Sequence, residues 1–195
     1  MRSARGERRT RETHVKVELN IDGSGKSAVK TGIAFFDHML GALATHGLLD
    51  LKVDTKLLNS NGHHIVEDVG IVLGKALDSA LGDRRGIKRF GDALVPMDDS
   101  LALVAIDLGG RSYAVIDVDF KALAIEGMPT DLIIHFLETL AANGKFGFHA
   151  SLMRGRNDHH KAEALFKALG VALCSAVLIE PRAKGRVLSQ KGFLK

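Results

Sequence analysis

Apolar residues alternate with polar ones in some stretches of the chain and recur at helical spacing in others. Residues 15–21 are apolar at every second position, which predicts a half-buried strand. A turn at residues 22–25 leads into a second strand around residues 28–29. Residues 35–45 have the three- and four-residue spacing of a helix, and Gly47 is positioned to end it.

The pattern then returns to a strand and a longer helix. Residues 49–53 alternate again, and a polar loop at residues 59–62 separates this strand from the next periodic stretch. Helical spacing runs from His64 to Leu81, and Gly82 closes the helix. The first half of the chain is therefore predicted to fold in the order β-β-α-β-α.

The second half has the same order of elements. Residues 101–108 and 113–120 are predicted strands, and a helix capped by its first residue, an aspartate, covers residues 131–142. A short strand near residues 146–150 precedes a loop and a last helix that starts at His160. The chain thus contains two similar series of elements.

The two halves can be aligned directly with each other. With an offset of 96, residues 63–80 match residues 159–176 at nine of eighteen positions, and the matches include histidine, glutamate and glycine. With an offset of 97, five residues of the segment 38–47 recur in the segment 135–144. A shared helical pattern gives apolar matches but not these polar ones, so we infer an internal duplication.

The duplication predicts an α+β fold made of two β-β-α-β-α units. Each unit is expected to form a sheet with helices on one face, and the units pack about a pseudo-twofold axis as one compact body. The first unit covers residues 1–93 and begins with a basic arm. The second covers residues 94–195 and ends in a polar tail.

The most informative polar pattern is His-His-x-x-Glu, which occurs at residues 63–67 and again at residues 159–163. A further histidine precedes the first copy by 25 residues and the second by 24. Residues at positions i, i+1 and i+4 lie within one arc of a helix surface. Imidazole nitrogens and a carboxylate oxygen together form a donor set that binds Mn, Fe or Zn. A lone histidine pair is usually a solvated surface pair, but the duplicated set predicts two metal sites or one shared site between the halves. The candidate ligands are His38, His63, His64, Glu67, His135, His159, His160 and Glu163.

Composition narrows the class of protein. With 46% apolar and 26% charged residues, the chain of 195 residues is typical of a soluble globular protein. Cys174 is the single cysteine, so no intrachain disulfide forms and we expect a reducing, cytoplasmic location. No apolar run is long enough to span a membrane, and residues 1–11 lack the apolar core of a secretory signal.

The net charge of +4 comes mainly from residues 1–11, residues 84–89 and the C-terminal region. Basic clusters can bind nucleic acid. The chain has one tyrosine, no tryptophan and no nucleic-acid-binding motif, so we expect no nucleic-acid partner. A small anionic substrate explains a few arginines equally well.

Several polar residues outside the duplicated motif could bind a substrate. Arg89 and Arg111 are candidate phosphate ligands because guanidinium binds oxyanions bidentately, although solvated surface arginines are commoner. Residues 189–192 offer a phosphate cradle or are simply a polar tail, and Asp98-Asp99 is a hydroxyl-binding pair or a turn. Metalloprotease, zinc-finger and nucleotide-binding motifs are absent, which leaves hydrolysis, isomerisation and dehydration open.

Taken together, the motifs of residues 9–191 resemble those of one family, imidazoleglycerol-phosphate dehydratase. The order of the motifs along nearly the whole chain makes the resemblance specific. It rests on Arg9-Thr10-Arg11-Glu12-Thr13, Asp22-Gly23-x-Gly25, Phe35-Phe36-Asp37-His38-Met39-Leu40, His46-Gly47, His63-His64-x-x-Glu67-Asp68, Pro96-Met97-Asp98-Asp99 and Gly155-x-Asn157-x-His159-His160-x-x-Glu163-Ala164-x-Phe166-Lys167.

The resemblance implies Mn-dependent dehydration of imidazole glycerol phosphate to imidazole acetol phosphate, a step of histidine biosynthesis. It also implies two Mn ions per active site, held by the eight candidate ligands at subunit contacts of a cubic homo-oligomer of 24 chains. The substrate, a small anionic imidazole phosphate, would have its phosphate held by five of the binding residues, Arg89, Arg111, Lys167, Ser189 and Lys191. The implied substrate-binding residues are Glu12, His46, Arg89, Asp98, Arg111, Lys167, Ser189 and Lys191.

The proton removed in this reaction sits on a carbon with no adjacent carbonyl. The imidazole ring must therefore accept the electrons, and metals at its nitrogens would stabilise that charge. Glu163 and then Glu12 are the candidate catalytic carboxylates that would move the proton. Two rival functions remain, a di-metal phosphatase with the same ligands and a basic RNA-binding module whose histidines are structural.

Overall fold

The computed structural model describes residues 1–58 and 62–194. Its first unit has the predicted elements preceded by one additional strand, and most of the loop predicted at residues 59–62 lies outside the described residues. The strands form one sheet in the order β1-β2-β4-β3, in which only β3 and β4 are parallel neighbours. The elements are β1 (Ser3–Arg9), β2 (Thr13–Asn20), β3 (Ser27–Lys30), α1 (Ala34–Gly47), β4 (Asp50–Leu57) and α2 (Gly62–Leu81).

The second unit repeats this architecture and adds a small hairpin. Its sheet has the order β5-β6-β10-β7, which matches the first sheet strand for strand, and β7 is again parallel to its neighbour β10. The added hairpin pairs β8 (Ala124–Ile125) with β9 (Met128–Pro129). The other elements are β5 (Phe90–Met97), β6 (Ser100–Asp107), β7 (Tyr113–Asp117), α3 (Thr130–Gly144), β10 (Gly147–Arg154), α4 (Asp158–Val177) and a 3₁₀ turn, η1 (Pro181–Ala183).

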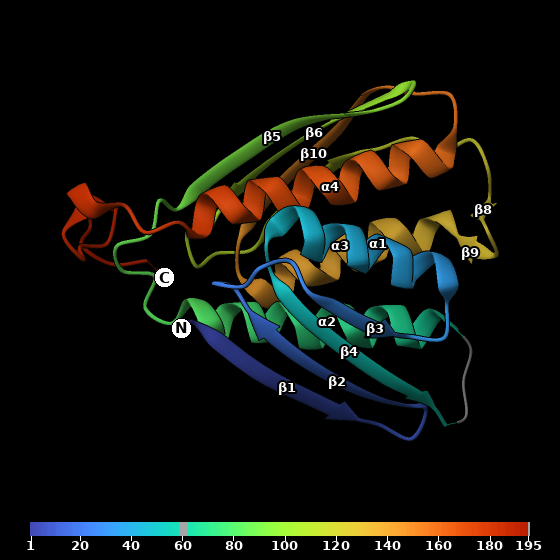
Figure 1. Cartoon of the computed structure of the whole chain (residues 1–195), viewed down its shortest axis with the longest axis horizontal. Helices are drawn as coiled ribbons and strands as arrows, with labels where there is room; N and C mark the ends of the chain where they lie inside the picture. The colour runs from blue at the N-terminus through green and yellow to red at the C-terminus, as the bar shows by residue number, and fades with distance from the viewer. Residues whose placement is uncertain (59–61, 195) are drawn as a thin grey trace.

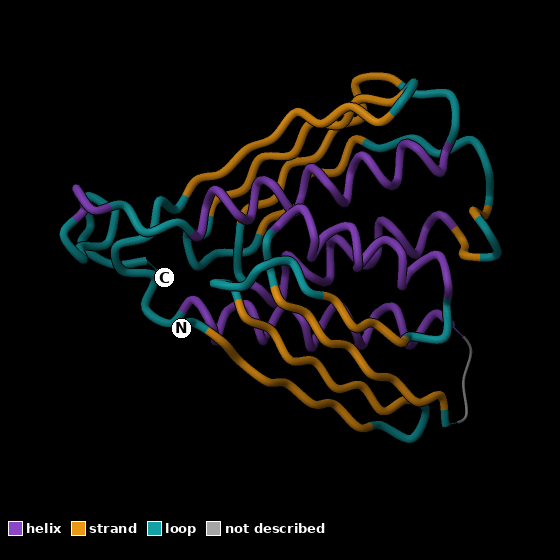
Figure 2. The backbone as a smooth tube through the Cα atoms, in the orientation of Figure 1, coloured by secondary structure: helices purple, strands orange, loops and turns teal. Residues whose placement is uncertain are grey.

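The two sheets form the outer layers of the molecule, and the four helices lie between them (Figure 1). The backbone trace shows each sheet covered by helices on its inner face (Figure 2). This arrangement confirms the predicted α+β class and the helices on one face of each sheet. Among the described residues, no helix has the length and apolar character needed to cross a membrane.

The basic segment expected as an N-terminal arm forms β1, an edge strand. Its sequence, Ser-Ala-Arg-Gly-Glu-Arg-Arg, lacks the alternation of large apolar residues that would have predicted a strand. Antiparallel pairing with β2 runs from Ser3 opposite Asn20 to Arg9 opposite His14. Backbone pairing thus builds this strand with little side-chain burial, and its charged side chains suit a sheet edge.

The first strand of the second unit, β5, was also absent from the prediction. It spans the expected boundary between residues 93 and 94, so the second sheet begins at Phe90. A Cβ atom on Gly91 would lie 2.0 Å from the carbonyl oxygen of Ala172, which shows that β5 lies directly against the backbone of α4. Close packing on the helix requires glycine here, and this glycine interrupts the apolar pattern of the strand.

The helices pair across the two units. Helix α1 packs against α4, and α2 packs against α3. A Cβ on Gly170 would lie 2.8 Å from the backbone nitrogen of Gly47, and one on Gly74 would lie 2.8 Å from that of Gly144. The matched glycines therefore allow two equivalent close helix crossings, which explains why glycine recurs at these positions in the duplication.

Two helix ends in the structure differ from the prediction. Gly47 does not itself terminate α1, because the left-handed residue after the helix is Leu48. Asp131 does not cap α3, since the helix already begins at Thr130 and the preceding residue, Pro129, makes no side-chain cap. Asp131 instead lies in the first turn, where a carboxylate complements the helix dipole.

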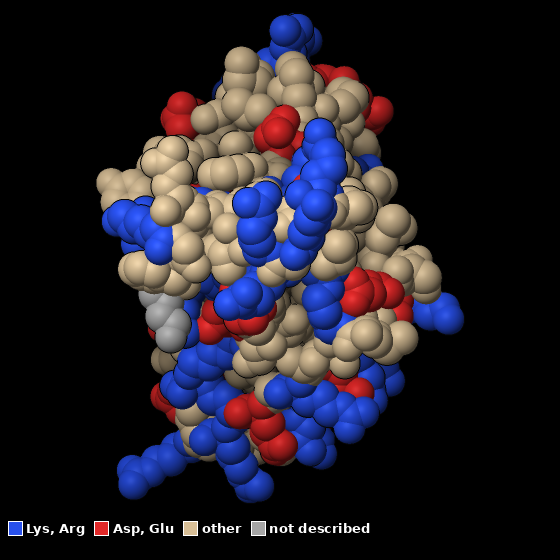
Figure 3. Space-filling view, turned by 90° about the vertical axis from the view of Figure 1, so that its left-hand side faces the viewer, with Lys and Arg blue, Asp and Glu red and all other residues tan. Residues whose placement is uncertain are grey.

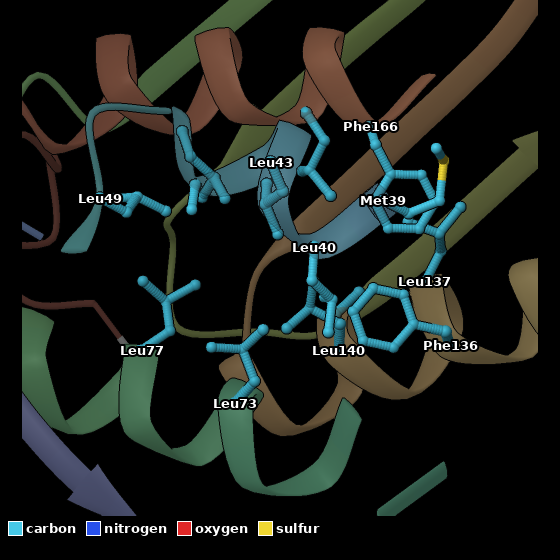
Figure 4. Close-up of a cluster of buried hydrophobic side chains, with 14 of the residues drawn as sticks. Met39, Leu40, Leu43, Leu49, Leu73, Leu77, Phe136, Leu137, Leu140 and Phe166 are labelled. Carbon is cyan, nitrogen blue, oxygen red and sulfur yellow. The ribbon is translucent and has the colours of Figure 1, made fainter. Parts of the chain in front are cut away.

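Apolar side chains from all four helices fill the space between the sheets (Figure 4). Leu43, Leu73 and Leu140 meet near the centre of the helix layer, and the Phe136 ring stacks on Phe166 with centroids 5.7 Å apart. Full burial of such a side chain stabilises the fold by about 1.5–3 kcal/mol. The buried apolar residues form one cluster that runs through both units.

Candidate metal centre

Six of the eight predicted metal ligands lie in two clusters near the N-terminal ends of the paired helices. The α1/α4 cluster consists of His38, His159 and Glu163, and the α2/α3 cluster consists of His135, His63 and Glu67. In each cluster, one potential ligand atom from every residue lies within 4.8 Å of the others. Each cluster joins the His-His-x-x-Glu motif of one unit to the upstream histidine of the other unit.

The α1/α4 cluster is centred on the Glu163 carboxylate. Its Oε2 lies 3.3 Å from Nε2 of His159 and 3.5 Å from Nε2 of His38. The two imidazole rings are 5.7 Å apart and tilted by 36°. Two ring nitrogens thus converge on one carboxylate oxygen, which is an arrangement that suits a borderline divalent cation.

The α2/α3 cluster has the same composition. Nε2 of His135 lies 3.7 Å from Oε1 of Glu67, and the rings of His135 and His63 stack with centroids 5.3 Å apart. Within the described part of the chain, the buried Nε2 of His135 makes no hydrogen bond. A buried polar atom left without a partner costs about 1–3 kcal/mol. A cation between these residues would satisfy it.

Local structure explains why the ligands converge. His159 and Glu163 are four residues apart on α4, as His63 and Glu67 are on α2, so each pair occupies one helix face. Asn157 caps α4 by accepting hydrogen bonds from the backbone N–H groups of His159 and His160, at 2.9 and 3.4 Å. The motif therefore begins at a fixed point of the first turn.

The remaining two predicted ligands, His64 and His160, lie outside these clusters and face carboxylates of the strand turns. Nδ1 of His160 is 2.7 Å from Oδ1 of Asp99, and its Nε2 is 3.5 Å from Oδ2 of Asp98. Nε2 of His64 is 3.5 Å from Oε2 of Glu12. Asp99 and Glu12 each directly precede the second strand of their sheet, so these contacts are also equivalent in the two units.

Asp99 is a site residue that sequence reasoning missed, although the Asp98-Asp99 pair was noted. Its carboxylate accepts hydrogen bonds from His160 and from the backbone N–H groups of Arg156 and Asn157. These hydrogen bonds hold the pKa of Asp99 well below its usual value. Asp99 therefore joins the β5–β6 turn to the loop that precedes α4 and orients the His160 ring.

Glu163 also has an unusual environment. Burial opposes ionisation of its carboxyl group, but a hydrogen bond and the charge of Lys167, together with His38, hold its pKa below the usual value. The Lys167 ammonium lies 2.7 Å from Oε1 of Glu163. An ionised carboxylate suits metal ligation, whereas a lowered pKa makes a weaker base for proton transfer.

The residues predicted to bind phosphate gather mainly at the opposite end of the molecule. Arg89 donates to both carboxylate oxygens of Asp107 at 2.7 and 2.9 Å and to the carbonyl oxygen of Leu188 at 2.7 Å. The hydrogen bonds to Asp107 raise the pKa of Arg89. The exposed Arg111 and Asp107 line a hollow of about 290 Å³ together with Gly109 and Tyr113.

The C-terminal tail completes this basic end. The backbone N–H of Lys191 donates to Oγ of Ser189 at 3.2 Å, and Leu188 joins the tail to Arg89 as described above. Several Lys and Arg side chains stand among acidic and uncharged residues on the end face on which the tail lies (Figure 3). Lys167 differs from the other phosphate candidates because it lies midway along α4 and contacts Glu163.

Apart from Lys167, the phosphate candidates lie far from the metal clusters of the same chain. The backbone N–H of Arg89 donates to the carbonyl of Ala176 near the end of α4, whereas His159 is in its first turn. At 1.5 Å per residue this separation is roughly 25 Å. His46 is also far from the α1/α4 cluster. It is exposed in the last turn of α1, whereas His38 lies near the start of that helix. A hollow of about 720 Å³ lies over the first sheet and contains none of the predicted site residues.

A family model for imidazoleglycerol-phosphate dehydratase matches residues 31–173 of the chain. An imidazoleglycerol-phosphate dehydratase of Dehalococcoides mccartyi is 53% identical over 197 aligned residues, covering all of this chain and 98% of the relative. The enzyme of the same name from Methanothermobacter thermautotrophicus is also 53% identical, over 195 residues, with 100% of this chain and 98% of the relative covered.

Solved structures agree with the sequence relatives. The imidazoleglycerol-phosphate dehydratase of Pyrococcus furiosus superposes with a TM-score of 0.83 at 38% identity, covering 96% of this chain and 99% of that one. The Staphylococcus aureus enzyme superposes with a TM-score of 0.82 at 30% identity, covering 91% of this chain and 99% of that one. The chain therefore belongs to the imidazoleglycerol-phosphate dehydratase family, a family of hydro-lyases.

Proposed function

We propose that the protein catalyses the Mn-dependent dehydration of imidazole glycerol phosphate to imidazole acetol phosphate in histidine biosynthesis. The observation that carries the proposal is the pair of His-His-carboxylate clusters, each built from helices of both units. The relatives, which are imidazoleglycerol-phosphate dehydratases, support the choice of substrate.

The residues present fit a metal of this kind. Each cluster offers two imidazole nitrogens and one carboxylate oxygen, a donor set that Mn, Fe and Zn accept. The buried Nε2 of His135, which has no hydrogen bond within the described residues, also fits a metal ligand. When bound, the two ions would act as Lewis acids that stabilise negative charge on the substrate's imidazole ring.

Residues of the chain itself would bind the metal, remove the proton and bind a substrate hydroxyl. Glu163, ionised beside Lys167, serves as a ligand, so the proton on carbon is better removed by Glu12 in the β1–β2 turn. The side chain of Glu12 is 47% exposed and can approach a substrate from solvent. Asp98, exposed in the β5–β6 turn beside His160, would bind a substrate hydroxyl.

Phosphate binding would fix the substrate's position. Arg89, Arg111, Ser189 and Lys191 form a basic end that suits a phosphate group. A substrate of this size cannot span the roughly 25 Å between Arg89 and the α1/α4 cluster, a length that follows from the rise of α4. A complete site therefore needs the basic end of one chain beside the metal clusters of another.

This requirement supports a homo-oligomer, which we propose to be the cubic assembly of 24 chains. The outer face of the second sheet exposes Leu94, Leu103 and Val115, whereas the outer face of the first carries ion pairs such as Lys52–Glu18. Exposed apolar patches of this kind mark protein–protein contacts. A further copy of the chain is the partner that both features favour.

The proposed reaction can be tested directly. The purified protein is treated with a chelator, resupplied with Mn and incubated with imidazole glycerol phosphate, and both the ketone product and inorganic phosphate are measured. We expect ketone to form only with Mn and no phosphate to be released. Phosphate release without ketone would overturn the proposal in favour of a phosphatase, and salt-sensitive RNA binding by a metal-free protein would favour a nucleic-acid role.

Light scattering tests the assembly separately. We expect the Mn-loaded protein to have the mass of 24 chains, and a monomer that retains full activity would contradict a site shared between chains. Replacing Leu103 with lysine should weaken the assembly, because it puts a charge on the apolar outer face. The matched control is Lys52→Leu on the first sheet, which should not reduce the mass.

A further inference from the structure

The hairpin β8–β9 is a structural difference between the duplicated units. Three residues, 31–33, join β3 to α1 in the first unit, whereas twelve, 118–129, join β7 to α3 in the second. The longer connection contains the hairpin, and a three-residue connection has no room for one. The hairpin lies at the end of the molecule where α4 begins (Figure 1).

A glutamate at the tip of this hairpin contacts a predicted metal ligand. Oε1 of Glu126 lies 2.9 Å from Nδ1 of His159, while Nε2 of the same ring lies 3.3 Å from Glu163 in the α1/α4 cluster. The carboxylate of Glu126 therefore holds the Nδ1 proton and leaves the Nε2 lone pair directed toward the cluster. The edge-on ring of Phe35, 5.4 Å away, limits rotation of the imidazole.

The backbone around Glu126 is fixed in place. Ile125 and Met128 pair with each other and are buried, with 6% and 1% exposure. Asp158, the first residue of α4, accepts hydrogen bonds from the backbone N–H groups of Lys121 and Ala122, at 2.8 and 2.7 Å. The hairpin is thus tied to the first turn of the helix that carries His159, so the Glu126 contact does not depend on a loose loop.

The other side of the hairpin faces the second cluster without a comparable contact from Glu126. Gly127 and Met128 line a hollow of about 320 Å³ together with His63. The hairpin therefore lies between the two clusters, and its carboxylate is directed to the α1/α4 cluster. A carboxylate on the far nitrogen of a ligating histidine fixes its tautomer and raises its basicity.

We propose that Glu126 is a positioning residue that strengthens metal binding at the α1/α4 cluster by orienting the His159 ring. The inference rests on the proposed function for the metal itself, and adds a residue that orients one of the metal's ligands. Removal of a carboxylate of this kind typically weakens metal binding by roughly 10- to 100-fold.

The test is a titration of the full-length protein with Mn, in which free Mn²⁺ is measured by electron paramagnetic resonance. We expect two classes of site in the unaltered protein. Glu126→Gln and Glu126→Ala should weaken one class, the α1/α4 cluster, by roughly 10- to 100-fold and leave the other unchanged. Glu126→Asp keeps a carboxylate and should recover part of the affinity.

The chain offers a matched control in Glu7, whose Oε1 lies 2.5 Å from Nε2 of His14; neither residue belongs to a cluster. Glu7→Gln makes the same chemical change beside a histidine and should alter neither class. Equal weakening of both classes by Glu126→Gln, or no weakening, would overturn the inference while leaving the proposed function standing. Failure of the unaltered protein to bind Mn would instead overturn the metal dependence on which both rest.

Discussion

The α1/α4 and α2/α3 clusters have the same ligands but different surroundings. The Glu163 side chain is 11% exposed and is paired with Lys167, whereas the Glu67 side chain is 39% exposed and Ile71 occupies the corresponding position one helical turn later. The hairpin with Glu126 belongs to the second unit alone. The duplication thus repeats the donor set and varies the charge and the access around it, which predicts different tasks for the two metals.

The shared features come from the helix crossings. Gly47 against Gly170 and Gly144 against Gly74 bring the helix backbones close together at equivalent points. His38 and His135 are therefore held at similar distances from the motifs of the opposite units. The clusters depend on this crossing geometry, while their differences depend on side chains added around it.

Loss of a ligand is the strongest test of whether both clusters are needed. His38→Ala and His135→Ala should each reduce bound Mn from two ions per chain to about one, because each removes a third of one donor set. A metal that supplies several kcal/mol of transition-state stabilisation implies a rate loss of roughly 1000-fold or more. Steady-state kinetics and metal analysis provide the measurements.

The control for these variants is His14→Ala, which removes a histidine that is paired with Glu7 and belongs to neither cluster. It should retain both ions and nearly full activity. Full activity in either His38→Ala or His135→Ala would show that one cluster is dispensable, and the comparison between two working half-sites would then be wrong.

The helix crossings are expected to respond equally to substitution. Gly74→Ala and Gly170→Ala would each place a methyl group within 2.8 Å of backbone atoms of the neighbouring helix, so each should destabilise the fold by about 1–3 kcal/mol. Urea unfolding in the presence of chelator measures the free energy of unfolding without the metal's contribution.

Gly41→Ala is the matched control within α1, because its Cβ would meet only Ser27 at an ordinary 3.8 Å. Alanine has the better helix propensity, so this variant should be as stable as the original or more stable by up to about 1 kcal/mol. A large difference between Gly74→Ala and Gly170→Ala in the free energy of unfolding would mean that the two helix crossings are not equivalent.

The spacing of the motifs was sufficient to predict residues that the structure brings together in the two clusters, because residues four apart on a helix share a face. The strand β1 could not be identified, since backbone pairing with β2 builds it and its side chains are mostly charged. Asp99 and Glu126 contact their histidines only through tertiary structure, and no local pattern marks them. The distance between Arg89 and the clusters likewise follows from how α4 is oriented, which spacing does not encode.

The ammonium beside Glu163 should weaken metal binding at its cluster by repulsion. Lys167→Met removes this charge and should raise the Mn affinity of the α1/α4 cluster by about tenfold, equivalent to roughly 1.4 kcal/mol. Ile71→Lys places an ammonium one turn after Glu67 and should lower the affinity of the α2/α3 cluster by a similar factor. Mn titration of both variants tests whether the charge of one ammonium group contributes to a difference in Mn affinity between the two clusters.

These two substitutions also separate metal binding from phosphate binding. If Lys167 also binds the substrate phosphate, Lys167→Met should raise KM despite the tighter metal. Unchanged Mn affinity in both variants would contradict an electrostatic difference between the clusters, and access or geometry would then have to explain it.

The smallest expected difference concerns the turn carboxylates, Asp99 beside His160 and Glu12 beside His64. Asp99→Asn should lower the melting temperature at pH 7, because the carboxylate accepts hydrogen bonds from His160 and two backbone N–H groups. Glu12→Gln should have less effect, since its side chain is half exposed and lies 3.5 Å from His64. Melting curves in chelator measure both without the metal's contribution.

The effect of Asp99 should also depend on pH with a definite sign. Its pKa in the folded protein lies below its value of about 3.9 in the unfolded chain, so ionised Asp99 stabilises the fold above that pH. This stabilisation is lost as pH falls from roughly 5 through the folded-state pKa. The difference in melting temperature between the original protein and Asp99→Asn should therefore be constant from about pH 5 to 8 and shrink on further acidification. A difference that grew in acid would show that the Asp99 carboxylate does not stabilise the turn as an anion.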